Sequence, residues 1–177
     1  MSHTQTHACL ATLATALTLC SAPALADIEV TFLESAPKDR FTFTNTGACD
    51  LGPAILSLDL SGSAAGLIFD TSGDGAGVEV FQPYETVAGA EVLEAITPVS
   101  DGDAQIALTV SGLAPGQSVG FTIDVDDTLR DSNLGQIRVS DSEIKGATAA
   151  VSFADQTSNG VFDATSRATL RAPACTS

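Results

Sequence analysis

The chain has 177 residues, with 22 Asp and Glu against 7 Lys and Arg, so its formal net charge at pH 7 is −15. Such a surface repels phosphate backbones and acidic lipid headgroups, which excludes nucleic-acid binding through counterion release and binding to an anionic membrane surface. With 44% hydrophobic residues, the chain has enough apolar surface to form a core, which excludes intrinsic disorder.

The first 26 residues have the pattern of an export signal. The apolar run from Ala8 to Leu19 is too short to span a bilayer as a helix, but it has the length of a signal-peptide core. Ala24-Leu25-Ala26 matches a small-x-small cleavage site. We expect a signal peptide at residues 1–26, no transmembrane span, and an extracellular or periplasmic mature chain from Asp27. Because Lys and Arg are absent before the apolar run, an uncleaved start is the alternative.

Cleavage would leave two cysteines, Cys49 and Cys175, in an oxidising compartment. Two cysteines allow one pairing, so we predict a disulfide that ties the C-terminal tail to an early loop. A pair of unpaired thiols is the alternative.

Hydrophobic alternation dominates the mature chain and predicts short strands. Ile28, Val30 and Phe32 alternate with polar residues, and Leu56, Leu58 and Leu60 alternate with Ser57 and Asp59. Further strands are expected at 41–44, 66–69, 78–81, 106–110, 119–125, 136–139, 147–153 and 168–170. Most of the phenylalanines, Phe81 included, fall on apolar strand faces and are expected in the core.

Turn residues separate these segments at about ten-residue spacing, as in a sandwich or barrel. Ser72-Gly73-Asp74-Gly75, Ala114-Pro115-Gly116 and Ser158-Asn159-Gly160 are turn sequences. Val87–Ala95 has loose helical spacing but is equally compatible with a strand or a loop. We therefore expect an all-β fold, a single antiparallel β-sandwich domain at residues 27–177.

Two motifs resemble immunoglobulin-like modules of bacterial surface proteins. In those modules a strand ends in Asn-Thr-Gly, as at Phe41–Gly47, and a later strand follows Leu-x-Pro-Gly-x-Ser, as at Leu113–Ser118. We expect Asn45-Thr46-Gly47 to close a hairpin and Pro115-Gly116 to form a type II turn before 119–125.

The mature chain as a whole resembles small secreted proteins of marine alphaproteobacteria known as aggregation factor core proteins. The resemblance rests on Ala36–Phe41, Leu58–Ser63, Gly66–Thr71 and Phe121–Leu129. It implies a role in cell adhesion.

Nucleophilic catalysis is poorly supported, because both histidines, His3 and His7, lie in the predicted signal peptide. Without imidazole, neither a Ser-His-Asp nor a Cys-His site can form. The glycine-rich segment 73–77 has no following Lys and is not a phosphate loop. We expect no enzyme activity.

The densest group of functional side chains is Asp124-Val125-Asp126-Asp127. Asp124 and Asp126 share one face of the strand, and Asp127 can fold back where the strand ends. Carboxylates crowded at a strand end suit Ca²⁺, which takes six to eight oxygen ligands. We predict a Ca²⁺ site here. Additional ligand candidates are Asp70, Asp74, Asp101, Asp103, Asp131 and Asp141, and competing cationic partners are Arg40, Arg130 and Arg138.

A solvated acidic strand end that only aids solubility is the alternative to the Ca²⁺ site. For the protein as a whole, the sequence favours a secreted structural or adhesive protein, with Ca²⁺ as a stabilising ion. The other candidate is a binding module for a glycan or a protein partner. An exposed aromatic platform would favour glycan binding, and an available strand edge would favour adhesion.

Overall fold

The computed structural model describes residues 25–35, 37–132, 134–153 and 156–174, and these form an all-β structure with one short helix. The predicted signal peptide lies outside the described residues except for its last two positions. The strands are β1 Leu25–Leu33, β2 Asp39–Asn45, β3 Ala54–Asp59, β4 Ile68–Asp70, β5 Glu85–Ala88, β6 Leu93–Ile96, β7 Gln105–Val110, β8 Ser118–Asp126, β9 Thr148–Phe153, β10 Gln156–Val161 and β11 Arg167–Ala174. The helix, α1, spans Asp141–Ile144, and no described helix has the length and apolar character needed to cross a membrane.

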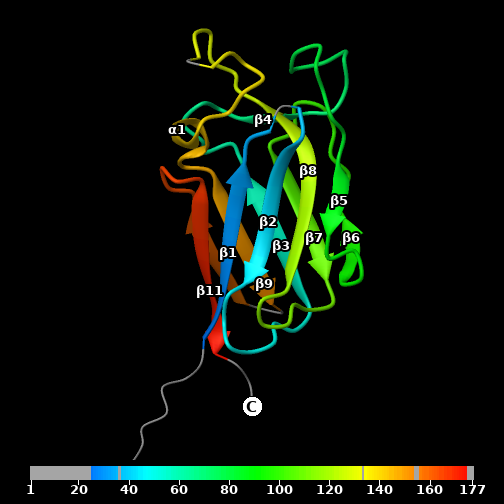
Figure 1. Ribbon diagram of the computed structural model, residues 1–177, viewed down its shortest axis with the longest axis vertical. Coiled ribbons are helices and arrows are strands. Elements are labelled where there is room, and N and C mark those ends of the chain that lie inside the picture. The colour runs from blue at the N-terminus through cyan, green and yellow to red at the C-terminus, as the bar shows by residue number, and fades with distance from the viewer. Residues whose placement is uncertain (1–24, 36, 133, 154–155, 175–177) are drawn as a thin grey trace, which may run out of the picture.

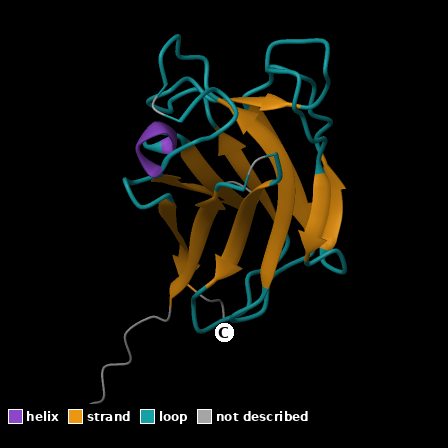
Figure 2. Ribbon diagram, turned by 45° about the horizontal axis from the view of Figure 1, so that its top comes forward, coloured by secondary structure: helices purple, strands orange, loops and turns teal. Residues whose placement is uncertain are grey.

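Two antiparallel sheets lie face to face, as in a β-sandwich (Figure 1). One sheet has the order β11-β1-β2-β8-β4, and β5 also pairs with β8. The other has the order β10-β9-β3-β7-β6. Figure 2 shows long loops and α1 gathered at one end of the two sheets.

One hydrophobic core fills the space between the sheets, because alternate residues of each strand point inward. Phe41 of β2 is its centre: its ring lies 5.4 Å from that of Phe121 and 5.0 Å from that of Phe32. Phe69 and Phe162 meet Phe41 edge-on, each at 6.5 Å. These rings join β1, β2, β4 and β8 to the segment that follows β10.

The predicted alternation is confirmed in most of the strands. Leu56, Leu58 and Leu60 are buried, whereas Ser57 and Asp59 face outward. The candidate helix at 87–95 is instead the end of β5, a turn and the start of β6.

Several local predictions are wrong. Residues 78–81 and 136–139 form no strand, and Phe81 is 43% exposed instead of belonging to the core. Ser158-Asn159-Gly160 lies inside β10 and is not a turn, because this segment pairs in register with β9.

Asn45 connects the two motifs that suggested an immunoglobulin-like module. Its side-chain amide donates hydrogen bonds to the main-chain carbonyls of Cys49 and Leu113, both at 2.8 Å. The main-chain carbonyl of Asn45 accepts a hydrogen bond from the Gly116 amide. Gly116 has a φ of +77°, as the predicted type II turn requires. The hairpin prediction is wrong, because the chain crosses after Asn45 from one sheet to β3 in the other.

The start of the predicted mature chain lies beside the last strand. Asp27 pairs with Arg171, and position 25, which belongs to the predicted signal peptide, pairs with 174. The Asp27 carbonyl also accepts hydrogen bonds from Thr46 and Gly47, which precede Cys49. Cys49 packs half-buried against the core, and Cys175 lies outside the described residues, so their disulfide stays a prediction.

We predict that Leu56→Ala lowers the free energy of unfolding by about 2–5 kcal/mol, because it leaves a cavity between the sheets. Its neighbour Ile55 is 46% exposed, so Ile55→Ala should change that free energy by less than about 1 kcal/mol. Urea unfolding of both variants measures the difference, and equal losses would contradict the described packing.

Candidate metal centre

Three aspartates from two neighbouring strands converge at the end of the six-stranded sheet. Asp124 and Asp126 belong to β8, and Asp70 is the last residue of β4, directly opposite Asp124 in the ladder. Directly opposed residues share a face of the sheet, as do residues two apart on one strand. One carboxylate oxygen of each aspartate lies within 4.8 Å of those of the other two, so these oxygens surround a single position.

All three side chains are removed from water, with exposed fractions of 0%, 0% and 1% for Asp70, Asp124 and Asp126. Four of their oxygens have no hydrogen-bond partner among the described residues: Oδ1 of Asp70, both oxygens of Asp124 and Oδ1 of Asp126. Buried carboxylates without partners are costly, because hydration is lost and nothing replaces it. The carboxylate oxygens of these three aspartates are therefore positioned to bind a cation.

No cation of the described chain compensates these charges. None of the three carboxylates forms an ion pair with a described Lys or Arg, and the ion pairs that do form, Lys38–Glu85 and Arg167–Glu29, lie elsewhere. The competing partners Arg40, Arg130 and Arg138 are all exposed.

Burial, together with the charges of the neighbouring carboxylates, raises the pKa of Asp70 to about 7 and that of Asp124 to about 8. The pKa of Asp126 is also raised, mainly by burial. Each carboxylate therefore disfavours the charged state of the others as long as no cation lies between them.

The loop between β4 and β5 closes over the three aspartates. The Val78 amide donates to Oδ2 of Asp70 at 2.9 Å and to Oδ2 of Asp126 at 2.8 Å. At Gly77, a Cβ atom would overlap the carboxylates of Asp70 and Asp126. The glycine-rich segment therefore brings its backbone close to carboxylates, a role that the sequence did not reveal.

Asp101 holds the first part of the same loop. Its Oδ1 accepts hydrogen bonds from the amides of Thr71 and Ser72, and its Oδ2 accepts one of 2.6 Å from Ala76. These amide bonds, that of Ala76 above all, lower the pKa of Asp101. Asp101, one of the additional ligand candidates, thus acts as a loop anchor.

Asp39 and Asp127 lie beside the group without belonging to it. Burial raises the pKa of Asp39 to about 7, but both of its oxygens accept backbone hydrogen bonds, from Ser35 and Val125. Asp127 is buried; its Oδ1 accepts the Leu129 amide, and its Oδ2 has no hydrogen-bond partner among the described residues. Asp127 was expected to fold back toward Asp124 and Asp126, but the structure groups these two with Asp70 instead. Asp127 follows Asp126 directly, and adjacent residues of an extended chain point to opposite faces.

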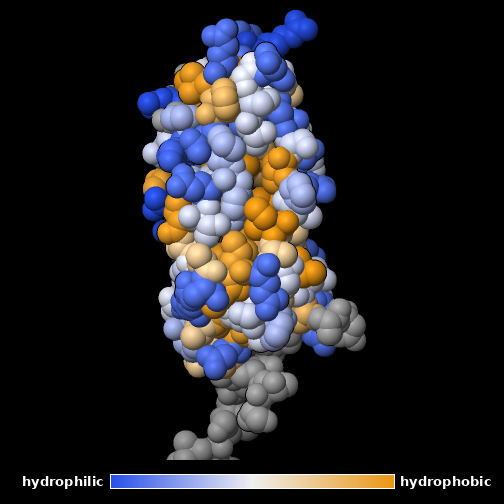
Figure 3. Space-filling model, turned by 90° about the vertical axis from the view of Figure 1, so that its right-hand side faces the viewer, coloured by the Kyte–Doolittle hydropathy of each residue, from blue (hydrophilic) through white to orange (hydrophobic). Residues whose placement is uncertain are grey.

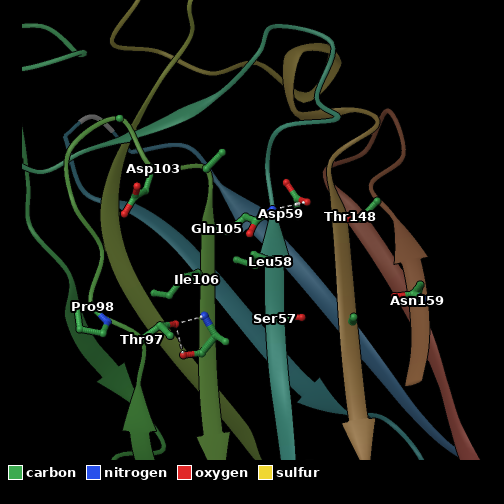
Figure 4. A pocket seen from close by; sticks show the side chains of 14 residues that line it. Ser57, Leu58, Asp59, Thr97, Pro98, Asp103, Gln105, Ile106, Thr148 and Asn159 are labelled. Atoms are coloured by element: carbon green, nitrogen blue, oxygen red, sulfur yellow. Dashed lines mark hydrogen bonds between the residues drawn. The ribbon is translucent and has the colours of Figure 1, made fainter. Parts of the chain in front are cut away.

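A hollow lined by described residues lies away from the aspartates, on the outer face of the five-stranded sheet (Figure 4). It encloses about 780 Å³. Ser57, Ala107 and Ala150 are register partners across β3, β7 and β9, and their small side chains form its floor. No buried polar group without a partner points into it, so the hollow alone indicates no ligand.

No family model, curated protein or solved structure matches this chain.

We predict that Gly77→Ala lowers the free energy of unfolding by about 1–3 kcal/mol, because the added methyl group must displace the loop or the carboxylates of Asp70 and Asp126. Gly52→Ala is the matched control, since a Cβ there has no neighbour within 4 Å. Thermal melts of both variants measure the effect, and a fully stable Gly77→Ala protein would contradict the described loop position.

We also predict that the calcium-free protein loses stability as the pH rises from 5 to 8. Asp39, Asp70, Asp124 and Asp126 keep their protons to a higher pH in the folded state than in the unfolded state, where aspartate titrates near 4. The folded state binds more protons in this window, so the free energy of unfolding falls with pH. Melting temperatures across the range test this, and a flat or rising profile would contradict it.

Proposed function

We propose that this chain is an exported, non-catalytic structural or adhesive protein that binds one Ca²⁺ ion through Asp70, Asp124 and Asp126. The observation that carries the proposal is the set of buried carboxylate oxygens without partners. Ca²⁺ is a hard cation that prefers carboxylate oxygens, and three carboxylates supply up to six of the six to eight ligands it takes. Zn²⁺ fits less well, because none of the three ligands is His or Cys.

The bound ion would fix the loop between β4 and β5 to the sheet. The Val78 amide already joins this loop to Asp70 and Asp126, and Asp101 holds the other part of it. A cation between the carboxylates removes their repulsion and so stabilises the closed loop. The complete burial of the three aspartates supports a structural role, because a catalytic acid or base must reach a substrate.

Export is supported by the predicted signal peptide at residues 1–26. Among the described side chains the core begins at Ile28, so cleavage before Asp27 would leave all of these buried residues in place. The predicted Cys49–Cys175 disulfide belongs to the same interpretation, because disulfides persist in exported proteins. The two antiparallel sheets support an immunoglobulin-like module and an aggregation-factor-like role without distinguishing these from other β-sandwiches.

The edge formed by β5 and β6 supports adhesion between copies of the chain. Each of these strands pairs on one side only, and Figure 3 shows apolar side chains gathered along this side of the molecule. Val80 and Phe81, in the loop that precedes β5, are 45% and 43% exposed. Both strands are short and carry a register shift, which disfavours the addition of a strand, so side chains would make the contact.

The calcium proposal predicts a higher melting temperature in Ca²⁺. An ion that binds only the folded state adds about 2.7 kcal/mol to the free energy of unfolding at a hundredfold excess over Kd, which is about 5–11 °C for a domain of this size. Asp126→Asn should abolish this shift and raise the melting temperature of the calcium-free protein, because it removes one of the repelling charges. Asp74→Asn, in the exposed part of the same loop, should keep the shift.

Millimolar CaCl₂ is compared with NaCl of matched ionic strength for the three proteins. Equal shifts in both salts, or a full shift in Asp126→Asn, would refute the calcium site.

The adhesive role predicts that beads coated with the protein aggregate in Ca²⁺ and disperse in chelator. Phe81→Ser should reduce aggregation several-fold. Val161→Ser should not, because Val161, although 60% exposed, lies on β10, an edge strand far from β5 and β6 in the sheet order. A calcium-binding protein whose beads never aggregate would refute adhesion and leave the calcium site intact.

A further inference from the structure

A second site lies on the outer face of the six-stranded sheet, in a pocket of about 340 Å³. Its centre is a row of register partners across four strands: Leu33 lies opposite Arg40, Arg40 opposite Thr122, and Thr122 opposite Glu85. Directly opposed residues share a face of the sheet, so these four side chains stand next to one another. The short Thr122 between the long Arg40 and Glu85 leaves the hollow.

Thr122 lines this pocket and is 3% exposed, and its hydroxyl has no hydrogen-bond partner in the part of the chain that the structure describes. Most buried hydroxyls in proteins are hydrogen-bonded, because leaving one without a partner costs about 1–3 kcal/mol. This hydroxyl lacks a partner although hydrogen-bonding side chains surround it. A ligand in the pocket would supply one.

The pocket carries a net positive charge on a strongly acidic protein. Lys38, Arg40 and Glu85 are its charged residues, which give a sum of +1 where the whole chain carries −15. Lys38 is paired with Glu85 at 2.9 Å, whereas the exposed Arg40 forms no ion pair or hydrogen bond with the described residues. A guanidinium group binds a carboxylate through two parallel hydrogen bonds, so Arg40 can receive one.

Most of the backbone behind the pocket is already used in the sheet. β1, β2 and β8 each pair with a strand on both sides, so an extended peptide cannot add its main chain to them. The fourth strand, β5, has one open edge, but it is short and carries a register shift, which disfavours the addition of a strand. Recognition must come from side chains. Leu33 and Val87, which are 61% and 42% exposed, supply apolar contact beside the charged and hydroxyl groups.

From this arrangement we propose that the pocket binds a uronate residue, a sugar ring that carries a carboxylate, as found in acidic glycans. The carboxylate pairs with Arg40, a ring hydroxyl bonds with the Thr122 hydroxyl, and the C–H face of the ring packs on Leu33 and Val87. This pocket adjoins the proposed calcium site, because Thr122 lies two residues before Asp124 on the same face of β8, but the two share no residue, so either can fail without the other.

The test is a titration of ¹⁵N-labelled exported protein with methyl glucuronide, followed by amide chemical shifts in calcium-free buffer. Methyl glucoside, which lacks only the carboxylate, is the ligand control. The glucuronide should cause saturable shifts around Leu33, Arg40 and Thr122. Arg40→Gln should weaken binding about tenfold or more, because a charge-assisted contact is lost.

Two further variants separate binding from folding. Thr122→Val should weaken binding several-fold without lowering the melting temperature, because the hydroxyl that it removes has no partner in the protein. Arg167→Gln removes another arginine from the same face of the sheet, one that is paired with Glu29, and should leave binding unchanged.

Absence of saturable shifts, equal shifts with the glucoside, or full affinity in Arg40→Gln would overturn the proposal. Binding of an acidic peptide at these amides without binding of the glucuronide would overturn it as well.

Discussion

The central constraint on this structure is the repulsion between three buried carboxylates, those of Asp70, Asp124 and Asp126. No described Lys or Arg pairs with them, and the loops at this end of the sandwich pack around them. Their side chains are almost entirely removed from water, and four of their oxygens have no partner. Burial and mutual repulsion both favour protonation, while a divalent cation would satisfy the oxygens directly. Protonation of the carboxylates and binding of a cation would each keep β4 paired with β8, but only a cation would do so while the carboxylates stay charged.

The rest of the fold brings these residues together and covers them. The phenylalanines around Phe41 join β2, β4 and β8, so that the short strand β4 places Asp70 opposite Asp124. The glycines of segment 73–77 let the loop backbone approach the carboxylates, and Asp101 holds the loop through three amides. At the other end of the sheets, Asn45 joins the loop after β2 to the one before β8.

The sequence predicted those features that depend on local patterns. Alternation located most strands, and the acidic segment contains Asp124 and Asp126, two of the three clustered aspartates, as well as Asp127, which lies beside them. Asp70 was one of several additional candidates, because only the pairing of β4 with β8 brings it opposite Asp124. Residues 78–81 alternate like a strand, but the Val78 amide bonds to carboxylates and not to a neighbouring strand. The local sequence Ser158-Asn159-Gly160 predicts a turn, but the segment forms a strand because it pairs with β9.

The most direct test of the proposed calcium site is a crystal structure of the protein grown with CaCl₂, with anomalous scattering used to identify the ion. We expect one Ca²⁺ with carboxylate oxygens of Asp70, Asp124 and Asp126 at 2.3–2.6 Å, the usual range for this cation. Carboxylates that hydrogen-bond to one another around an empty position, with calcium absent or bound only elsewhere, would contradict the account.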